Sequence, residues 1–219
     1  MELLLLSNSR TENGWLVDHV PAIRELAAGR RRAFFIPYAV VGTPWEEITA
    51  KLFDVLDFLS PVEEVDEAEL IVVSGGNTFQ LLAETRRRGL LPKIRNALRN
   101  GARYVGWSAG ANLACPTIKT TNDMPIVDPG GLEALGLVPF QINPHYTNAH
   151  PPGHQGETRD QRLAEYALAN PAVPVIGLPE GDWLRVSGGE AVLHGPHPAV
   201  VFSGKAAPAP LRPGPFRVP

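Results

Sequence analysis

A serine in a glycine-bounded turn is the residue with the clearest chemical meaning. Residues 106–110 read Gly-Trp-Ser-Ala-Gly and fit the pattern G-x-S-x-G. An apolar segment at 102–106 precedes the serine and small residues at 109–114 follow it, which indicates a strand, a sharp turn and a helix. In this context the Ser108 hydroxyl projects from the turn, and we predict that it is a nucleophile. The alternative is an ordinary connection in which the serine caps the helix.

A second glycine-rich turn, Ser-Gly-Gly-Asn-Thr at 74–78, also lies between an apolar run and a helical pattern. The carboxyl ends of parallel strands meet at one edge of a sheet, so the two turns are expected to be neighbours. Gly75 and Gly76 leave their backbone N–H groups accessible, and with the N–H of Ala109 they are predicted to form an oxyanion hole. A plain helix cap explains the same spacing, whereas the dinucleotide fingerprint G-x-G-x-x-G is absent from this turn.

A serine nucleophile needs a general base, and His145 is the candidate because it follows a strand-like segment at 138–142, which is expected to place it at the same rim of the sheet as Ser108. Two carboxylates compete to orient this histidine. Glu180 follows the apolar segment 174–178, whereas Asp123 lies in a long loop. Asp123 would give the serine, acid, histidine order of α/β-hydrolases and Glu180 would not, but order alone leaves both open. We favour Glu180, because a group just beyond a buried strand is held more rigidly.

A metal site is the alternative use of the histidines. His145 shares a loop with His150, His154 and Glu157, a set of side chains that zinc accepts. Two prolines in that loop interrupt any helix that would align them, and the chain has no H-E-x-x-H motif and no cysteine partner. We therefore expect no metal.

Composition limits the function classes. The 219 residues, 44% hydrophobic and 20% charged, predict one folded domain at 1–204, followed by a proline-rich tail at 205–219. A net charge of −3 without a basic stripe argues against nucleic acid. The apolar run at 3–6 is too short for a signal peptide core or a membrane span. With one cysteine and no export signal, we expect a cytoplasmic protein that does not bind membranes.

The elements around these turns alternate between strand and helix patterns. Strands are predicted at 2–7, 32–38, 70–74 and 102–106, with a short one at 62–65, and helices at 15–28, 45–59, 78–88 and 91–100. After residue 115 we expect strands at 138–142, 174–178 and 200–203, a helix at 159–169, and a hairpin of 182–186 with 190–194. Continuous apolar strands indicate burial on both faces. The predicted fold class is α/β, with an open, mostly parallel sheet flanked by helices.

Several blocks of this sequence together resemble the peptidase E family, the bacterial aspartyl dipeptidases. The blocks span nearly the whole chain to about residue 203 and lie at 1–9, 75–82, 106–118, 120–128, 141–145, 156–162 and 176–181. The resemblance implies a sheet related to class I glutamine amidotransferases, with a nucleophile elbow that carries serine in place of their cysteine. It also implies a cytoplasmic serine hydrolase, monomeric or homodimeric, that cleaves dipeptides with an N-terminal aspartate and needs no cofactor.

The same resemblance implies roles for single residues. Ser108 matches the nucleophile and His145 the general base, while Glu180 and Asp123 both match acidic positions of the family. Arg159, in the block Gly-Glu-Thr-Arg, matches the residue expected to pair with the aspartyl carboxylate of the substrate. A guanidinium suits this task because it offers a permanent charge and two parallel donors. From composition alone, an exposed arginine at the start of a helix is an equal alternative.

Two features depart from the family pattern. The segment at 60–69 is shorter than expected, which predicts a reduced or missing edge strand, and His150 stands where an apolar residue is expected. Two rival functions remain at this point. One is hydrolysis of β-linked or polymeric aspartyl peptides, as in the related cyanophycinases. The other is a catalytically silent binding module, which the intact motif residues disfavour.

Overall fold

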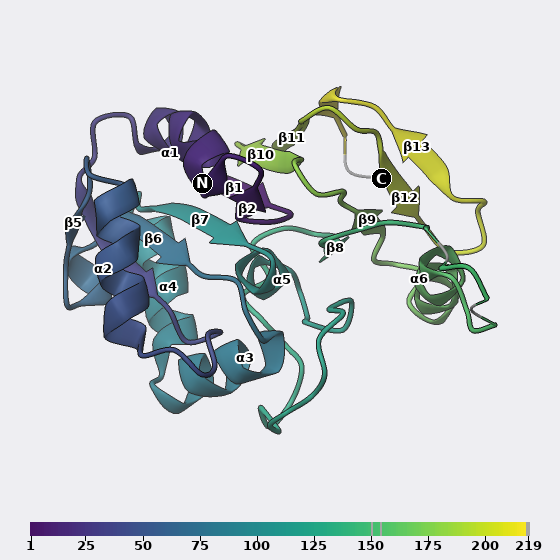
Figure 1. The fold of residues 1–219 in the computed structure, drawn as a ribbon, viewed down its shortest axis with the longest axis horizontal. Coiled ribbons are helices and arrows are strands. Elements are labelled where there is room, and N and C mark those ends of the chain that lie inside the picture. The colour runs from purple at the N-terminus through teal and green to yellow at the C-terminus, as the bar shows by residue number, and fades with distance from the viewer. Residues whose placement is uncertain (150, 154, 218–219) are drawn as a thin grey trace.

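The computed structural model describes residues 1–149, 151–153 and 155–217 (Figure 1). In these ranges one sheet has eight strands, in the order β14 (Gly214–Phe216), β11 (Glu190–His194), β10 (Trp183–Ser187), β1 (Glu2–Leu6), β7 (Arg103–Trp107), β6 (Leu70–Val73), β4 (Arg32–Ile36) and β5 (Ser60–Pro61). The strands from β1 to β5 in this order are parallel, and β10, β11 and β14 extend the sheet in antiparallel pairing. The predicted open, mostly parallel sheet and its C-terminal hairpin are confirmed.

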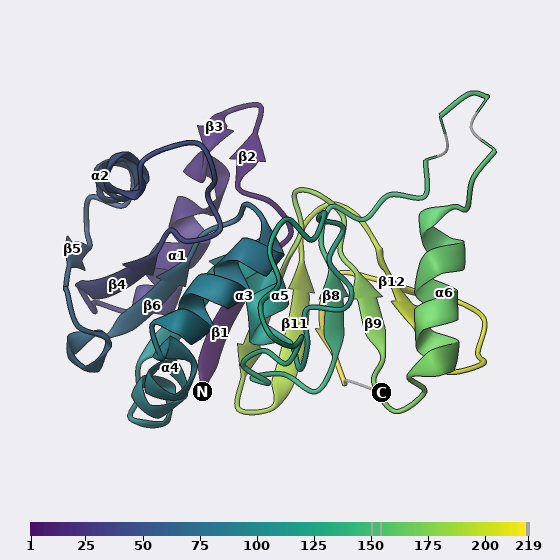
Figure 2. The ribbon, with the colours of Figure 1, turned by 90° about the horizontal axis from the view of Figure 1, so that it is seen from below.

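Helices cover both faces of this sheet (Figure 2). One face packs on α1 (Val20–Ala27) and α2 (Trp45–Val55), and the other on α3 (Thr78–Arg87), α4 (Leu90–Arg99) and α5 (Ala109–Ala114). The leucines of β1 are all buried and alternate between the two faces. Leu4 and Leu6 pack on the face covered by α1 and α2, and Leu3 and Leu5 on the face covered by α3, α4 and α5. A strand covered on both faces cannot alternate apolar and polar residues.

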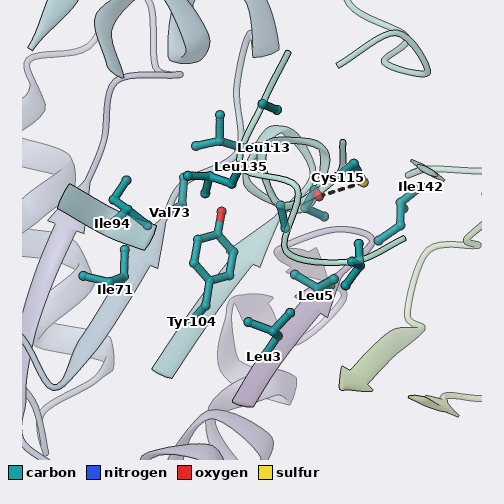
Figure 3. Close-up of a cluster of buried hydrophobic side chains, with 14 of the residues drawn as sticks. Leu3, Leu5, Ile71, Val73, Ile94, Tyr104, Leu113, Cys115, Leu135 and Ile142 are labelled. Carbon is teal, nitrogen blue, oxygen red and sulfur yellow. Dashed lines mark hydrogen bonds between the residues drawn. The ribbon is translucent and has the colours of Figure 1, made fainter. Parts of the chain in front are cut away.

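Figure 3 shows part of the core around β7 and α5, with Tyr104, Leu113 and Cys115 among its side chains. This core has no room for a larger residue at Gly110. A Cβ at Gly110 would lie 2.4 Å from the carbonyl oxygen of Val73, and the buried Tyr104 hydroxyl donates a hydrogen bond of 2.7 Å to the Gly110 carbonyl. Cys115 belongs to the same core, where its thiol contacts the Ala111 carbonyl oxygen at 3.4 Å. Burial raises the pKa of this thiol to about 12, so it is an inert core side chain.

A second, four-stranded sheet was not expected. Its order is β13 (Ala209–Leu211), β12 (Ala199–Phe202), β9 (Val175–Gly177) and β8 (Gln141–Asn143), and α6 (Arg159–Ala169) packs against it. The predicted strands near 138–142, 174–178 and 200–203 therefore exist, but the expectation that His145 and Ser108 lie at the rim of one sheet is wrong. β8 pairs with β9 rather than with β1, because the edge of β1 is already taken by β10.

The ends of the sheets also differ from expectation. The short strand predicted at 62–65 lies instead at Ser60–Pro61, where β5 pairs with β4 over only two residues, in keeping with the shortened segment. In the tail, β13 pairs with β12 and β14 pairs with β11, so the proline-rich segment covers an edge of each sheet. Within the described ranges, no helix combines the length and apolar character needed to cross a membrane.

The helix predicted from residue 15 begins later than expected. A small hairpin, β2 (Arg10–Thr11) with β3 (Gly14–Trp15), and the 3-10 turn η1 (Val17–His19) come before α1. The hairpin turns at Glu12-Asn13, and Gly14, which pairs with Thr11 at the start of β3, has a positive φ of 128°. The hairpin stands beside the edge of the sheet where the strands β1, β6 and β7 end (Figure 2).

Gly110→Ala is expected to destabilise the fold by about 3 kcal/mol, because overpacking pushes α5 away from β6. Urea unfolding measures the loss. Gly136→Ala is the control, since Gly136 has a φ of 61° but free space around it, and the left-handed backbone alone costs about 1 kcal/mol. Equal losses in the two variants would show that the close approach of α5 to β6 does not require glycine.

Candidate active site

Ser108 lies at a strained turn between β7 and α5. Its φ of 51° and ψ of −111° are rare for a residue other than glycine. The turn is held from both sides, because the Ser108 N–H donates to the Leu6 carbonyl at 3.1 Å and its carbonyl accepts from the Asn112 N–H at 3.0 Å. Gly106 is required by packing, since a Cβ there would lie 2.5 Å from the Gly110 carbonyl oxygen. This strand, turn and helix form a nucleophile elbow.

The side chains of Ser108, His145 and Glu180 form one chain of contacts. The Nε2 atom of His145 lies 2.9 Å from Ser108 Oγ, and its Nδ1 atom lies 2.6 Å from Glu180 Oε1. The three residues follow β7, β8 and β9, so two sheets contribute to the group. His145 itself has a φ of 54°, which turns the imidazole away from the direction of β8. A hydroxyl, an imidazole and a carboxylate in this order can activate the hydroxyl as a nucleophile.

Two polar residues after β1 hold this arrangement, and the sequence analysis did not identify them. The buried Ser7 hydroxyl donates to the Leu178 carbonyl at 2.8 Å and accepts from the His145 N–H at 2.8 Å. Asn8 Oδ1 accepts from the Gly181 N–H at 2.8 Å. The signal was present as polar residues at the carboxyl end of an apolar strand, the position where functional groups gather in open α/β sheets.

Asp123 lies apart from the histidine, at the start of α3. Its Oδ2 atom accepts hydrogen bonds from the Thr78 N–H at 2.7 Å, the Thr78 hydroxyl at 2.5 Å and the Thr121 hydroxyl at 3.0 Å. A carboxylate at a helix N-terminus is stabilised by the free N–H groups and by the helix dipole. In this structure, therefore, Glu180 rather than Asp123 contacts His145.

The second glycine-rich turn lies against the first. A Cβ at Gly75 would be 3.1 Å from Ser108 Cβ and 2.8 Å from the Trp107 ring, and a Cβ at Gly76 would overlap the Ala39 carbonyl. The backbone of this turn can approach Ser108 because neither residue has a side chain. Ala109 is buried at the first position of α5, directly after the serine.

These residues surround one cavity of about 610 Å³. It is lined by Ser108, His145, Glu180, Asp123, Gly75 and Gly76, together with Asn8, Ser9, Arg10, Trp15, Val40, Thr43, Ile48, Lys51, Ser74 and Trp107. Its volume suits a ligand of a few residues at most. The floor is the carboxyl edge of the parallel strands, where ligands bind in this class of fold.

Arg159 does not line this cavity. It lies in a neighbouring cavity of about 240 Å³, where its Nη1 donates to Asn143 Oδ1 at 3.0 Å. The Asn143 side-chain amide donates in turn to Asn122 Oδ1 at 2.7 Å, one residue before Asp123. Burial lowers the pKa of Arg159, and no ion pair of the described residues includes it.

The metal alternative rests partly on residues outside the described ranges, since His150 and His154 are among them. Elsewhere, in the described parts of the chain, no group of three or more histidine, cysteine or acidic side chains is arranged to hold a metal ion. The contacts of His145 with Ser108 and Glu180 occupy both of its ring nitrogens.

An elbow serine at the carboxyl edge of an open α/β sheet, in contact with an imidazole and a carboxylate, defines a serine hydrolase. Comparisons with known proteins agree: the family model described as Peptidase family S51 matches residues 3–194. The chain belongs to peptidase family S51 and is a serine peptidase of the aspartyl dipeptidase type. The predicted resemblance to peptidase E, and with it a hydrolase rather than a silent module, is confirmed.

Curated relatives match over almost their whole length. Peptidase E of Salmonella arizonae is 55% identical over 214 residues, covering 92% of this chain and 93% of its own. Peptidase E of Citrobacter koseri is 53% identical over 226 residues, covering 98% and 99%. Among solved structures, a putative peptidase E protein from Listeria monocytogenes has 24% identity and a TM-score of 0.65, covering 89% and 98%. A peptidase from an acI-B1 Actinobacterium has 20% identity and a TM-score of 0.68, covering 99% and 96%. The two structures support the fold.

Ser7→Ala is expected to reduce kcat for Asp-Leu about tenfold, because the His145 backbone and the Leu178 carbonyl both lose their shared partner and the imidazole loses its alignment. Steady-state kinetics measure the effect, and Ser60→Ala, on the exposed edge strand β5, is the matched control. A kcat equal to that of the unchanged protein would show that Ser7 does not position the histidine.

Proposed function

We propose that Ser108, His145 and Glu180 form the catalytic triad of this dipeptidase. His145 Nε2 takes the proton from the Ser108 hydroxyl as the oxygen attacks the carbonyl carbon of the Asp–Xaa bond. The same proton is then given to the leaving amine, and water releases aspartate from the acyl-enzyme in the reverse sequence. The observation that carries this proposal is the continuous contact from Ser108 Oγ through the imidazole to Glu180.

Glu180 is proposed to accept the Nδ1–H of His145. This hydrogen bond keeps the basic lone pair on Nε2, facing the serine, and stabilises the imidazolium that forms during attack. The Glu180 side chain is 64% exposed, and its carboxylate contacts His145 Nδ1 at 2.6 Å. Its position is maintained by the turn that Asn8 holds through the Gly181 N–H.

The oxyanion of the tetrahedral intermediate is proposed to accept hydrogen bonds from the backbone N–H groups of Gly75, Gly76 and Ala109. The close approach of Gly75 to Ser108 supports this role, as does the place of Ala109 at the N-terminus of α5. Donors fixed by the backbone need no reorganisation as the negative charge develops, which is why such groups lower the barrier strongly.

Asp123 is proposed to bind the free ammonium group of the substrate. The carboxylate lines the same cavity as Ser108, and its side-chain hydrogen bonds with the described residues are all made by Oδ2. Oδ1 therefore has lone pairs available for a cation. The N-terminal ammonium lies one residue before the scissile bond, so a carboxylate on the wall of this cavity suits it.

Arg159 is proposed to select the aspartyl side chain. In this structure its guanidinium contacts an amide oxygen and lies outside the Ser108 cavity, so substrate binding must draw it toward the scissile bond. This role is supported by the surroundings of Arg159, which is half-buried and has a neutral hydrogen-bond partner. Such a cation is stabilised more by a new contact with a carboxylate than a fully solvated cation is. Hydrogen bonds through Asn143 and Asn122 link Arg159 to the segment that carries Asp123, a residue of the Ser108 cavity.

The remaining proposals concern where and on what the enzyme works. We propose a cytoplasmic enzyme, monomeric or homodimeric, that acts on small Asp-Xaa peptides, with its chemistry confined to residues 1–204. The buried cysteine and the small cavity are consistent with this proposal. β-linked or polymeric aspartyl peptides are the alternative substrates, and the assay below separates them.

Among Asp-Leu, β-Asp-Leu, Asn-Leu and Leu-Leu, the enzyme is expected to hydrolyse Asp-Leu by far the fastest, and Ser108→Ala to lower kcat by roughly four orders of magnitude. Arg159→Met should reduce kcat/KM for Asp-Leu about 100-fold and leave Asn-Leu almost unchanged, because only the former has a carboxylate to lose. Arg162→Met, also on α6, is the control. Equal rates on all four peptides would refute the specificity, and faster cleavage of β-Asp-Leu would favour the alternative.

Substitutions of Glu180 and Asp123 are expected to change different kinetic constants. Glu180→Gln should lower kcat at saturating Asp-Leu by about 100-fold or more, because the imidazole loses its orienting acceptor, whereas Asp123→Asn should chiefly raise KM. Full steady-state curves for both variants provide the test. The reverse pattern would assign the orienting role to Asp123.

A further inference from the structure

One side of the active-site cavity carries two cations that the proposed chemistry does not use. Arg10, on the β2–β3 hairpin, and Lys51, on α2, both line the cavity that contains Ser108. In Figure 2, α2 and the hairpin lie on one side of α5, and β8 and β9 lie on the other. Ser108 immediately precedes α5, so the cations come from elements on one side of this helix, and the strands that precede His145 and Glu180 lie on the other.

Neither cation is neutralised within the described part of the chain. No ion pair there includes Arg10 or Lys51, whereas the acidic groups of the same cavity are engaged: Glu180 contacts His145, and Asp123 accepts hydrogen bonds from Thr78 and Thr121. Lys51 Nζ lies 5.1 Å from the centre of the Trp15 ring, which orients the ammonium group beside the cavity. Lys51 and Arg10 are therefore free to bind an anion that enters this cavity.

Apolar side chains connect the serine to these cations. Trp15 packs edge-on against Trp107, with ring centres 6.0 Å apart, and Ile48 and Val40 also line the cavity. A leaving amino acid would therefore find an apolar wall for its side chain and cations beyond it. The α-carboxylate of that amino acid lies one residue past the scissile bond, and it is present only when the substrate ends there.

We propose that Lys51, assisted by Arg10, binds the α-carboxylate of the residue after the scissile bond and thereby restricts the enzyme to dipeptides. This inference rests on the proposed function. A third residue would move the carboxylate by about 3.3–3.6 Å and put a neutral amide in its place. The loss of a charge-assisted contact then penalises longer peptides and blocked C-termini.

The test compares Asp-Leu with Asp-Leu-amide, which differ only at this carboxylate. The unchanged enzyme should have a kcat/KM for the free acid about 10–100-fold above that for the amide, in line with a hydrogen bond between charged groups. Lys51→Met should lower kcat/KM for Asp-Leu by a similar factor and leave the amide unchanged within about twofold. Lys51→Arg should restore most of the difference, and adding Arg10→Gln to Lys51→Met should remove what remains.

Lys93→Met, on the exposed face of α4, is the matched control, and thermal unfolding of each variant separates a loss of fold from a loss of contact. Equal losses on the acid and the amide in Lys51→Met, or no loss on either, would overturn the proposal while leaving the aspartyl dipeptidase activity intact. If the unchanged enzyme cleaves neither compound, the proposed function fails and the inference fails with it.

Discussion

The contact between the Ser108 hydroxyl and the His145 imidazole crosses from one sheet to another, and the site depends on how those two sheets are joined. The Ser7 hydroxyl connects the two sheets by hydrogen bonds. It follows β1 of the large sheet, donates to the carbonyl after β9 and accepts from the backbone N–H of the histidine after β8. Ser7 is fully buried, so water does not compete for the hydrogen bonds of its hydroxyl. Because hydrogen bonds require short distances, these two bonds hold the ends of the two sheets close together.

Backbone strain is concentrated at the same place. Of the described residues other than glycine, four have a positive φ, and two of these are Ser108 and His145. Such a conformation costs about 1–3 kcal/mol at each position and persists only where the surroundings enforce it. Here the N–H groups of Ser108 and His145 donate to the Leu6 carbonyl and the Ser7 hydroxyl, and the Ser108 carbonyl accepts from the Asn112 N–H. The two strained residues are thereby held with the hydroxyl and the imidazole in contact.

The sequence predicts those parts that follow from local patterns. Continuous apolar runs such as 2–7 and 70–74 identify buried parallel strands, and glycines around Ser108 identify the elbow. Glu180 was favoured on rigidity, and it is the acid that contacts His145 in the structure. The division into two sheets could not be predicted from the sequence. It depends on which distant strands pair, and local periodicity carries no information about strand pairing. The contact of Ser7 with His145 joins residues 138 positions apart, and the contact of Arg159 with Asn143 joins residues 16 positions apart. Neither contact could be predicted from local sequence patterns.

The distribution of charge in the cavity follows from the way the chain wraps around the sheet. The carboxylates of Glu180 and Asp123 come from the connections that follow β9 and α5, whereas the free cations come from the β2–β3 hairpin and from α2. A dipeptide in its ordinary ionic form carries an ammonium at one end and a carboxylate at the other, so with the proposed roles of Asp123 and Lys51 its charges fit the cavity in one direction only. Reversed binding would bring like charges together at both ends, which is costly in a cavity partly shielded from water. An enzyme with this arrangement can therefore fix the direction of its substrate electrostatically before the serine reacts, and the side chain of the first residue is left to decide specificity.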